Sequence, residues 1–210
     1  MENKRAVIVG AAKITRYKSI RAYFSPADFF IYCDAGLKHE KKLGRPADLI
    51  IGDFDSAENP CRSTETMVLP HEKDDTDTLF AVKEAIRRGF NSFLLVGVVG
   101  GRLDHTLGNV AILTMLSERG FSGMIVDDYS EIETVSDKPA YVLDKYPYFS
   151  LLNITGICRG ATVKNALYPL DNAELTTDFP LGVSNEPLKG KTAEIKVGEG
   201  KALLVRVREE

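Results

Sequence analysis

The chain has 210 residues, of which 44% are hydrophobic and 27% are charged, and its formal net charge is -3. This composition is typical of a globular protein with a substantial core, and the negative charge argues against a general attraction to nucleic acid or to anionic membranes. No apolar run approaches the ~20 residues that a membrane helix needs. The cysteines have neither paired nor zinc-binding spacing, so we expect reduced thiols in a cytoplasmic protein.

Up to about Asp127 the chain alternates short apolar runs with helical patterns. The runs are rich in Val, Ile, Leu and Phe with little alternation, which is typical of strands buried on both faces of a parallel sheet. Helices are predicted over 77–88 and 104–119, the second with an apolar stripe that includes Leu103 and Leu107. The alternation favours an α/β fold with a doubly wound, mostly parallel sheet. The predicted strands are 6–10, 29–33, 48–52, 66–70 and 93–99.

Beyond about Asp127 the pattern changes to short strands separated by turn residues, and no convincing helix remains. We therefore predict an α/β domain over 1–130 and a smaller antiparallel β-sandwich domain over 131–210. Apolar strands in so small a β domain would gain from a dimer. The strands predicted here are 131–136, 140–144, 148–154, 161–166, 192–197 and 202–207.

Four consecutive strand ends of the first domain carry acids, glycines or both. Ligands of an open α/β sheet bind outside the carboxyl ends of its strands, so these segments are expected to meet at one edge. Their convergence predicts a single binding site, which none of them would predict alone. The segments are Asp34-Ala35-Gly36, Asp53-Phe54-Asp55-Ser56, residues 71–77 and residues 100–105.

Asp53 and Asp55 form the sharpest pair among these acids. If the chain stays extended there, both carboxylates point to the same side, about 6.5–7 Å apart. Two such carboxylates can ligate a Mg²⁺ that also takes phosphate oxygens. The alternative is a turn in which both acids accept backbone N–H groups.

The segment that precedes the first predicted helix places Lys73 beside several acids. Asp75 or Thr76 is a candidate N-cap, and an acid in the first helical turn is favoured by the helix dipole. Capping accounts for one acid but not for three with a lysine beside them. The functional interpretation assigns Asp74 and Asp77 to a metal and Lys73 to a phosphate.

The segment before the second helix begins with Gly100-Gly101, which allows backbone to approach a ligand closely. The helix N-terminus that follows is an anion site, and Arg102 there is a candidate bidentate phosphate clamp. Asp104 either caps the helix or orients a substrate, and His105 is equally compatible with a structural role.

Two common nucleotide motifs are missing. No GxGxxG follows a predicted strand. Gly190-Lys191-Thr192 imitates the end of a P-loop, but Asn185 stands where the earlier glycine is required and the segment lies in the β region.

Taken in order, the motifs resemble the thiamine pyrophosphokinase family, over about residues 6 to 207. The resemblance rests on short segments whose joint order and spacing are specific. They are Asp53-Phe54-Asp55-Ser56, Lys73-Asp74-x-Thr76-Asp77, Gly100-Gly101-Arg102-x-Asp104-His105 with Asn109, Tyr168-Pro169-Leu170, and Gly182-Val183-Ser184-Asn185-Glu186.

The resemblance implies a homodimer with sites between subunits that converts ATP and thiamine into AMP and thiamine diphosphate with Mg²⁺. It implies metal ligation by Asp53, Asp55 and Asp77, with Asp74 as a further candidate, and thiamine contacts from Asp104 and Ser184. The catalytic candidates are Asp53, Asp55, Asp77 and Asp104. The candidates for binding ATP or thiamine are Asp34, Gly36, Lys73, Gly100, Gly101, Arg102, Ser184 and Asn185.

Two alternatives remain open at the level of sequence. Another Mg²⁺-dependent phosphotransferase, acting on a different small alcohol, would use the same α/β segments, and release of ADP instead of AMP would identify it. A nucleotide-binding regulatory module would bind ATP without consuming it, but it has no use for so many acids at one edge. A nucleic-acid partner is excluded by the lack of a basic patch.

Overall fold

The computed structural model describes residues 4–54, 63–70 and 74–208, and the chain forms two compact units, Met1–Asp128 and Tyr129–Glu210. Within those described ranges, no helix has both the length and the apolar character needed to cross a membrane.

The first unit is built on a parallel sheet with the strand order β6-β5-β1-β2-β3-β4. The chain moves outward from β1 through β2, β3 and β4, then returns to place β5 on the other side of β1. The switch point of this doubly wound sheet therefore lies between β1 and β5. The strands are β1 (Arg5–Val9), β2 (Phe29–Cys33), β3 (Leu49–Gly52), β4 (Glu65–Val68), β5 (Ser92–Val96) and β6 (Ser122–Val126).

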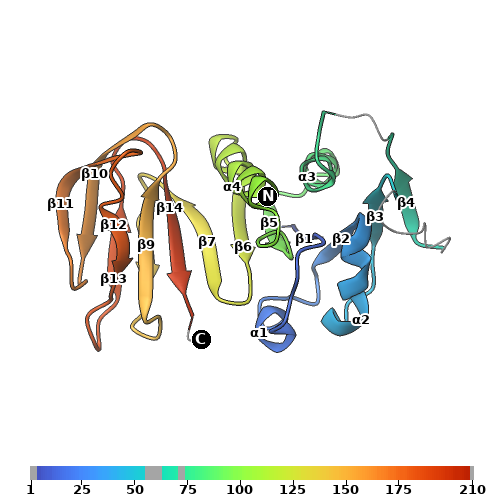
Figure 1. Ribbon diagram of the computed structural model, residues 1–210, viewed down its shortest axis with the longest axis horizontal. Helices are drawn as coiled ribbons and strands as arrows, with labels where there is room; N and C mark the ends of the chain where they lie inside the picture. The colour runs from blue at the N-terminus through green and yellow to red at the C-terminus, as the bar shows by residue number, and fades with distance from the viewer. Residues whose placement is uncertain (1–3, 55–62, 71–73, 209–210) are drawn as a thin grey trace. The chain divides into compact units, whose positions relative to one another are not determined.

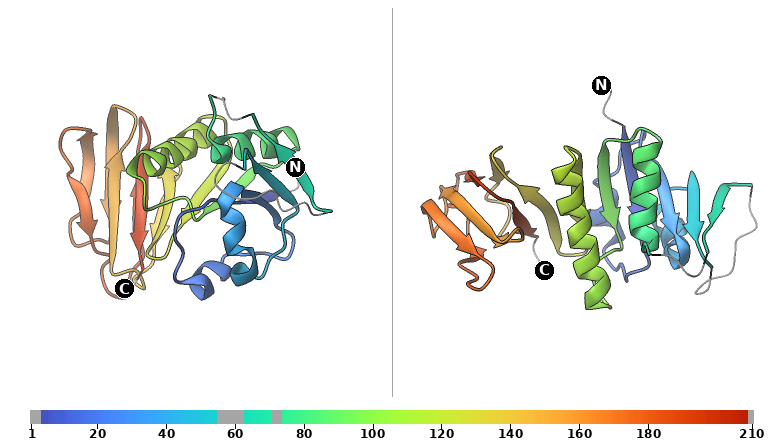
Figure 2. Two further views of the ribbon diagram at one scale, coloured as in Figure 1. Left: turned by 45° about the vertical axis from the view of Figure 1, so that its right-hand side comes forward. Right: turned by 90° about the horizontal axis from the view of Figure 1, so that it is seen from above.

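Helices cover both faces of this sheet, as the α/β prediction requires (Figure 1). One face packs against α3 and α4, which lie side by side in Figure 2, and the other against α1 and α2. Because both faces are covered, the central strands are almost fully buried, and they are apolar apart from the first residues Arg5 of β1 and Ser92 of β5. The helices are α1 (Tyr17–Arg21), the 3-10 helix η1 (Asp34–His39), α2 (Glu40–Leu43), α3 (Asp77–Arg87) and α4 (Leu103–Glu118).

The predicted apolar stripe of α4 was wrong about which side packs. Leu103 and Leu107 are 71% and 60% exposed, whereas Ile112, Leu113 and Leu116 are buried. The helix is apolar on two sides. The side with Ile112, Leu113 and Leu116 packs on the sheet, because the C-terminal half of α4 lies over β6. Two leucines are thereby left on the surface of the single chain.

The second unit is an antiparallel β-sandwich, as predicted. One sheet has the order β12-β9-β14-β7 and the other β11-β10-β13-β8. Side chains from both sheets share one core, which includes Phe149, Leu204, Val163 and Ile195. The strands are β7 (Ser130–Val135), β8 (Ala140–Val142), β9 (Tyr148–Asn153), β10 (Ile157–Lys164), β11 (Leu170–Thr176), β12 (Gly182–Asn185), β13 (Ala193–Lys196) and β14 (Ala202–Val207).

Glycines bring the strand ends of the first unit into backbone contact at the switch point. A Cβ on Gly10 would lie 2.6 Å from the carbonyl oxygen of Gly97, and one on Gly97 would lie 2.7 Å from that of Gly10. A Cβ on Gly36 would lie 2.4 Å from the carbonyl oxygen of Val9. No real Cβ tolerates such distances, so these loops meet only because the side chains are absent.

We expect Gly36→Ala to destabilise the first unit by about 1–3 kcal/mol, because backbone must shift to admit the methyl group. Gly108→Ala is the matched control: Gly108 lies in α4 with open space around its Cβ position, so alanine should add up to about 1 kcal/mol of helix stability. Urea unfolding of both variants measures the difference. Equal stabilities would contradict the close contact at Gly36.

Candidate active site

A cavity of about 780 Å³ lies at the switch point of the parallel sheet. Its position is the one at which open α/β sheets bind ligands. The loops after four strands and the first turns of α3 and α4 line it. The lining segments are Gly10 to Lys13, Cys33 to Ala35, Asp53, Thr76 to Thr78, Gly97 to Arg102, His105 and Asn109.

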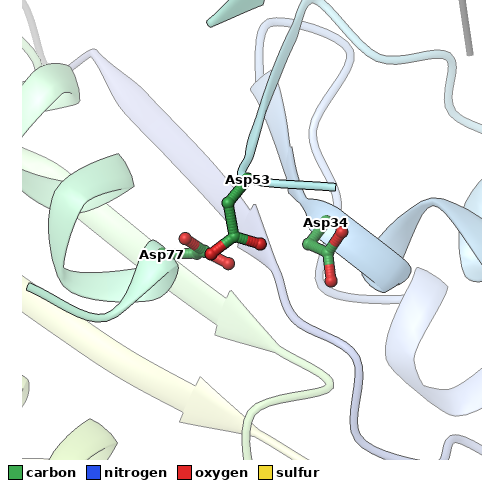
Figure 3. Close-up of side chains that lie close together, drawn as sticks. All are labelled: Asp34, Asp53 and Asp77. Atoms are coloured by element: carbon green, nitrogen blue, oxygen red, sulfur yellow. The ribbon is translucent and has the colours of Figure 1, made fainter. Parts of the chain in front are cut away.

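Three carboxylates gather at this cavity, from Asp34, Asp53 and Asp77 (Figure 3). One oxygen of each lies within 4.8 Å of one from both others. Like charges at this distance repel each other, and a divalent cation between them removes the repulsion. An all-oxygen, all-carboxylate set is the donor chemistry that Mg²⁺ prefers, so the three residues fit such an ion.

Each acid is placed by a different local device. Asp34 is the first residue of η1, has a left-handed φ of 43° and is only 8% exposed. Asp53 directly follows β3, where the chain leaves the sheet. Asp77 opens α3, whose N-cap Thr76 accepts a hydrogen bond from Leu79 N at 3.2 Å. Left-handed non-glycine residues are strained and gather at functional sites.

The predicted geometry for Asp53 and Asp55 rested on an extended chain, and that premise was wrong. Phe54 has a φ of 56°, so the backbone turns directly after Asp53. Asp55 and Lys73 lie outside the described residues. Asp74 is described, is exposed and does not belong to the group of three acids. Asp75 forms an ion pair with Lys83 at 2.8 Å.

The loop before α4 begins with the glycine pair. Gly100 and Gly101 both have positive φ, 101° and 73°, and open space surrounds their Cβ positions. Thr106 holds the loop to the helix, because its hydroxyl accepts from Gly100 N and donates to Arg102 O, each at 3.1 Å. Asn109 is buried and donates to Val98 O at 2.8 Å. The loop is thus fixed from within α4.

Arg102 and Asp104 bind each other at the mouth of this loop. Two hydrogen bonds, of 2.5 and 3.2 Å, join the guanidinium to the carboxylate, and both side chains are exposed. The Arg102 bond lowers the pKa of Asp104 to about 2, with help from the His105 backbone. Asp104 lies in the first turn of α4 but Arg102 is the N-cap, so Asp104 does not cap the helix.

Ser184 and Asn185 belong to the second unit. Ser184 is exposed with a left-handed φ of 59°, and its N–H donates to Ser150 Oγ at 3.1 Å. The Asn185 side chain is buried and holds the Tyr168 backbone: Nδ2 donates to Tyr168 O at 2.7 Å, and Oδ1 accepts from Tyr168 N at 3.0 Å. Asn185 thus anchors a loop, and Ser184 is the strained residue beside it.

Two features of this site were not predicted from the sequence. Asp34 was expected to bind nucleotide but lies within the acidic group, and the loop Gly10 to Lys13 was not considered. The signal for the loop was present, because a glycine and a lysine follow the first strand. The first strand of a doubly wound sheet lies at the switch point, so its end always borders the site.

Comparison with known families gives the class of protein. Residues 20–124 match the family profile described as "Thiamin pyrophosphokinase, catalytic domain", and residues 132–202 match "Thiamin pyrophosphokinase, vitamin B1 binding domain". The chain belongs to the thiamin pyrophosphokinase family. The two matches fall in the two units, in the order that the resemblance of the motifs implies.

The chain is also similar to a curated relative in sequence and to solved structures in fold. The chain is 29% identical over 144 residues to a thiamine pyrophosphokinase of Bacillus subtilis, covering 64% of this chain and 67% of that one. A crystal structure of thiamine pyrophosphokinase from B. subtilis has a TM-score of 0.86 at 21% identity, covering 99% and 100%. One of thiamin pyrophosphokinase from Geobacillus thermodenitrificans has 0.83 at 24%, covering 98% of each chain. The structures share the fold across both units.

Proposed function

We propose that this protein transfers the pyrophosphoryl group of ATP to the hydroxyl of thiamine, releasing AMP and thiamine diphosphate. The observation that carries the proposal is the group of Asp34, Asp53 and Asp77 at the switch point of a family fold. The reaction places several negative charges in one place, so the protein's task is mainly to position the reactants and neutralise charge. We expect it to do so in the cytoplasm.

The acidic group is the proposed site of Mg²⁺. Asp34, Asp53 and Asp77 would hold the ion, and the sequence adds Asp55 as a candidate ligand. A bound Mg²⁺ would supply positive charge at the phosphate oxygens and at the leaving AMP. Two of the ligand residues come from strand ends and one from a helix start. The sheet and α3 therefore fix their separation before the ion arrives.

The loops around the acids supply donors for the polyphosphate. Gly100 and Gly101 leave backbone open to a ligand at the N-terminus of α4, and Lys73 is a candidate from the sequence. Arg102 brings a guanidinium to the lining of the cavity, but it is bound to Asp104. Arg102 must leave that carboxylate to clamp a phosphate, which it matches with the same bidentate geometry.

The proton of the thiamine hydroxyl needs an acceptor, and Asp104 is the candidate. While Arg102 binds it, the pKa of Asp104 is about 2, which makes it a weak base. Transfer of Arg102 to the polyphosphate would raise that pKa toward its ordinary value. The arrival of ATP would thereby free Asp104 to accept the proton or orient thiamine.

The second unit is the proposed source of the thiamine pocket. Its profile match is described as a vitamin B1 binding domain, and Ser184 is exposed and strained on β12. Phe179, Leu181 and Val183 are exposed beside it along the chain. This combination of apolar side chains with one hydroxyl suits a heterocycle that carries a few polar groups.

The protein is expected to convert ATP and thiamine into AMP and thiamine diphosphate when Mg²⁺ is present. Chromatography of the nucleotides gives the result, and ADP as product, or no consumption of ATP, would contradict the proposal.

Asp53→Asn should lower turnover at least about 100-fold, because it removes one proposed ligand and one charge. Mg²⁺ should raise the melting temperature of the wild type but not of this variant.

Asp75→Asn is the matched control for that experiment. Like Asp53→Asn, it removes one carboxylate, but Asp75 is bound to Lys83 and lies outside the acidic group. Its turnover and its response to Mg²⁺ should stay within about twofold of the wild type, since an exposed ion pair contributes little. An equal loss in both variants would show that the assignment of Asp53 to a metal is wrong.

Ser184→Ala is expected to raise the KM for thiamine about three- to tenfold, the effect of one lost hydrogen bond, and to leave the KM for ATP nearly unchanged. Ser184→Gly removes the same hydroxyl but relaxes the left-handed backbone. Both variants should therefore behave alike in steady-state kinetics. A KM for thiamine that changes only in the glycine variant would assign the effect to the backbone instead of the hydroxyl.

A homodimer is part of the proposal. Leu103 and Leu107 of α4 are exposed in the single chain, and a second copy would bury such side chains. Sedimentation velocity should give twice the mass of the chain, and Leu107→Ser should weaken the association. A wild-type monomer at micromolar concentration would contradict this part of the proposal while leaving the chemistry untouched.

A further inference from the structure

A buried histidine holds the loop that follows β1. His39 lies in η1 and is 3% exposed, and it does not line the cavity. Its Nε2 lies 2.8 Å from the carbonyl oxygen of Ala12, and its Nδ1 lies 2.8 Å from the hydroxyl of Tyr17. Ala12 does line the cavity. His39 therefore contacts the site from behind, through the backbone.

The partners of His39 define its tautomer. A carbonyl oxygen only accepts, so Nε2 carries the proton and donates it to Ala12. In the neutral ring Nδ1 then accepts from the Tyr17 hydroxyl. Burial lowers the pKa of His39, which favours the neutral ring. Both ring nitrogens are thus used, and each in a defined direction.

The same loop is held at two further points. Lys38 Nζ donates to the carbonyl oxygen of Ala11 at 2.5 Å, and Ala12 N donates to Gly97 O at 2.8 Å. Consecutive side chains of η1 therefore bind consecutive carbonyls of the loop, and the β5 loop binds from the other side. Together these bonds fix the orientation of both peptide planes.

Tyr17, which binds Nδ1 of His39, is also held in place. Tyr17 begins α1, and the two residues before it are bound by the buried Asp128. Thr15 N donates to its carboxylate at 2.8 Å and Arg16 N at 2.9 Å. The hydroxyl that orients His39 therefore follows a segment whose backbone is hydrogen-bonded to Asp128.

Fixing the Ala12 carbonyl also fixes the next N–H. No peptide bond among the described residues is cis, and in a trans peptide the C=O and N–H point in opposite directions. The Ala12 carbonyl points to His39, so the N–H of Lys13 points away from His39. Lys13 lines the cavity.

We propose that His39 is a positioning residue that turns the Ala12–Lys13 peptide so that the Lys13 N–H faces the cavity and binds a polyphosphate oxygen of ATP. This inference rests on the proposed function. A phosphate oxygen is the natural ligand for such an N–H, since backbone amides fixed at strand ends bind anions without reorganising. Without the His39 bond the peptide is free to turn its carbonyl toward the phosphate, which would repel it.

Two substitutions at His39 separate positioning from packing. His39→Leu fills the space but cannot bind Ala12 O. It should raise the KM for ATP about tenfold, because the Lys13 N–H would lose its hydrogen bond to a charged phosphate oxygen. The KM for thiamine, measured on the same variant, should change less than about twofold. His39→Gln retains an amide donor that reaches Ala12 O, so it should restore most of the ATP affinity.

Tyr17→Phe provides a second variant, for the case that His39→Leu fails to fold. It removes only the hydroxyl that orients the ring, and it should raise the KM for ATP by about threefold, less than the loss of the whole donor. NMR of ¹⁵N-labelled protein should show His39 as the Nε2-protonated tautomer in the wild type, assigned by its absence from the His39→Gln spectrum.

The outcomes are separable from those of the proposed function. If the wild type forms no thiamine diphosphate, the proposed function fails, whatever the variants do. If the wild type is active, the positioning role is overturned by a KM for ATP that His39→Leu leaves unchanged, by equal effects of leucine and glutamine, or by a proton on Nδ1 instead of Nε2. A selective rise in the KM for ATP that glutamine reverses supports it.

Discussion

The structure of the site depends on the close approach of three loops at the switch point of the parallel sheet. Gly10, Gly36 and Gly97 stand where any Cβ would overlap a neighbouring carbonyl oxygen. With these side chains absent, the ends of β1, β2 and β5 lie against one another, and the segments that carry Asp34 and the Lys13 amide reach one cavity. Side chains at these positions would force the loops apart and separate the groups that the chemistry needs together.

Electrostatics imposes a second constraint on the same cavity. Asp34, Asp53 and Asp77 place three carboxylates within 4.8 Å, an arrangement that costs free energy until a cation joins them. Left-handed backbone at Asp34 and Phe54 adds strain next to two of these acids. The burial of the strands of the first unit on both faces offsets this repulsion and this strain. Arg102 and Asp104 form an ion pair with each other, so the loop before α4 keeps both charges paired at little cost in free energy.

The loop after β1 shows how side chains that do not line the cavity contribute to the site. His39 and Lys38 bind the carbonyls of Ala12 and Ala11, so that the amides of the loop are oriented before a ligand arrives. Asn185 acts in the same way in the second unit, where it holds Tyr168 beside the strained Ser184. In both units, a buried side chain forms hydrogen bonds to backbone and thereby holds a neighbouring segment in place.

Sequence alone determined the α/β class, the succession of a parallel sheet and a β-sandwich, the helices that begin near Asp77 and Leu103, and the strand ends at which acids and glycines gather. These follow from local periodicity and from the rule for ligand sites in open sheets. The short helices α1 and α2 escaped, because four or five residues are too few to show a helical period.

Only the tertiary structure decided which acids meet and which apolar face packs. Asp34 and Asp77 are far apart in the sequence, and their meeting depends on strand order. The left-handed backbone at Phe54 departs from the extended chain that we expected after Asp53. Leu103 and Leu107 are spaced one helical turn apart, as the buried residues of α4 are, but the sheet packs against the side of Leu113 and Leu116. Direction and long-range contact are properties of the packed chain, which is why the role of His39 could be read only from the fold.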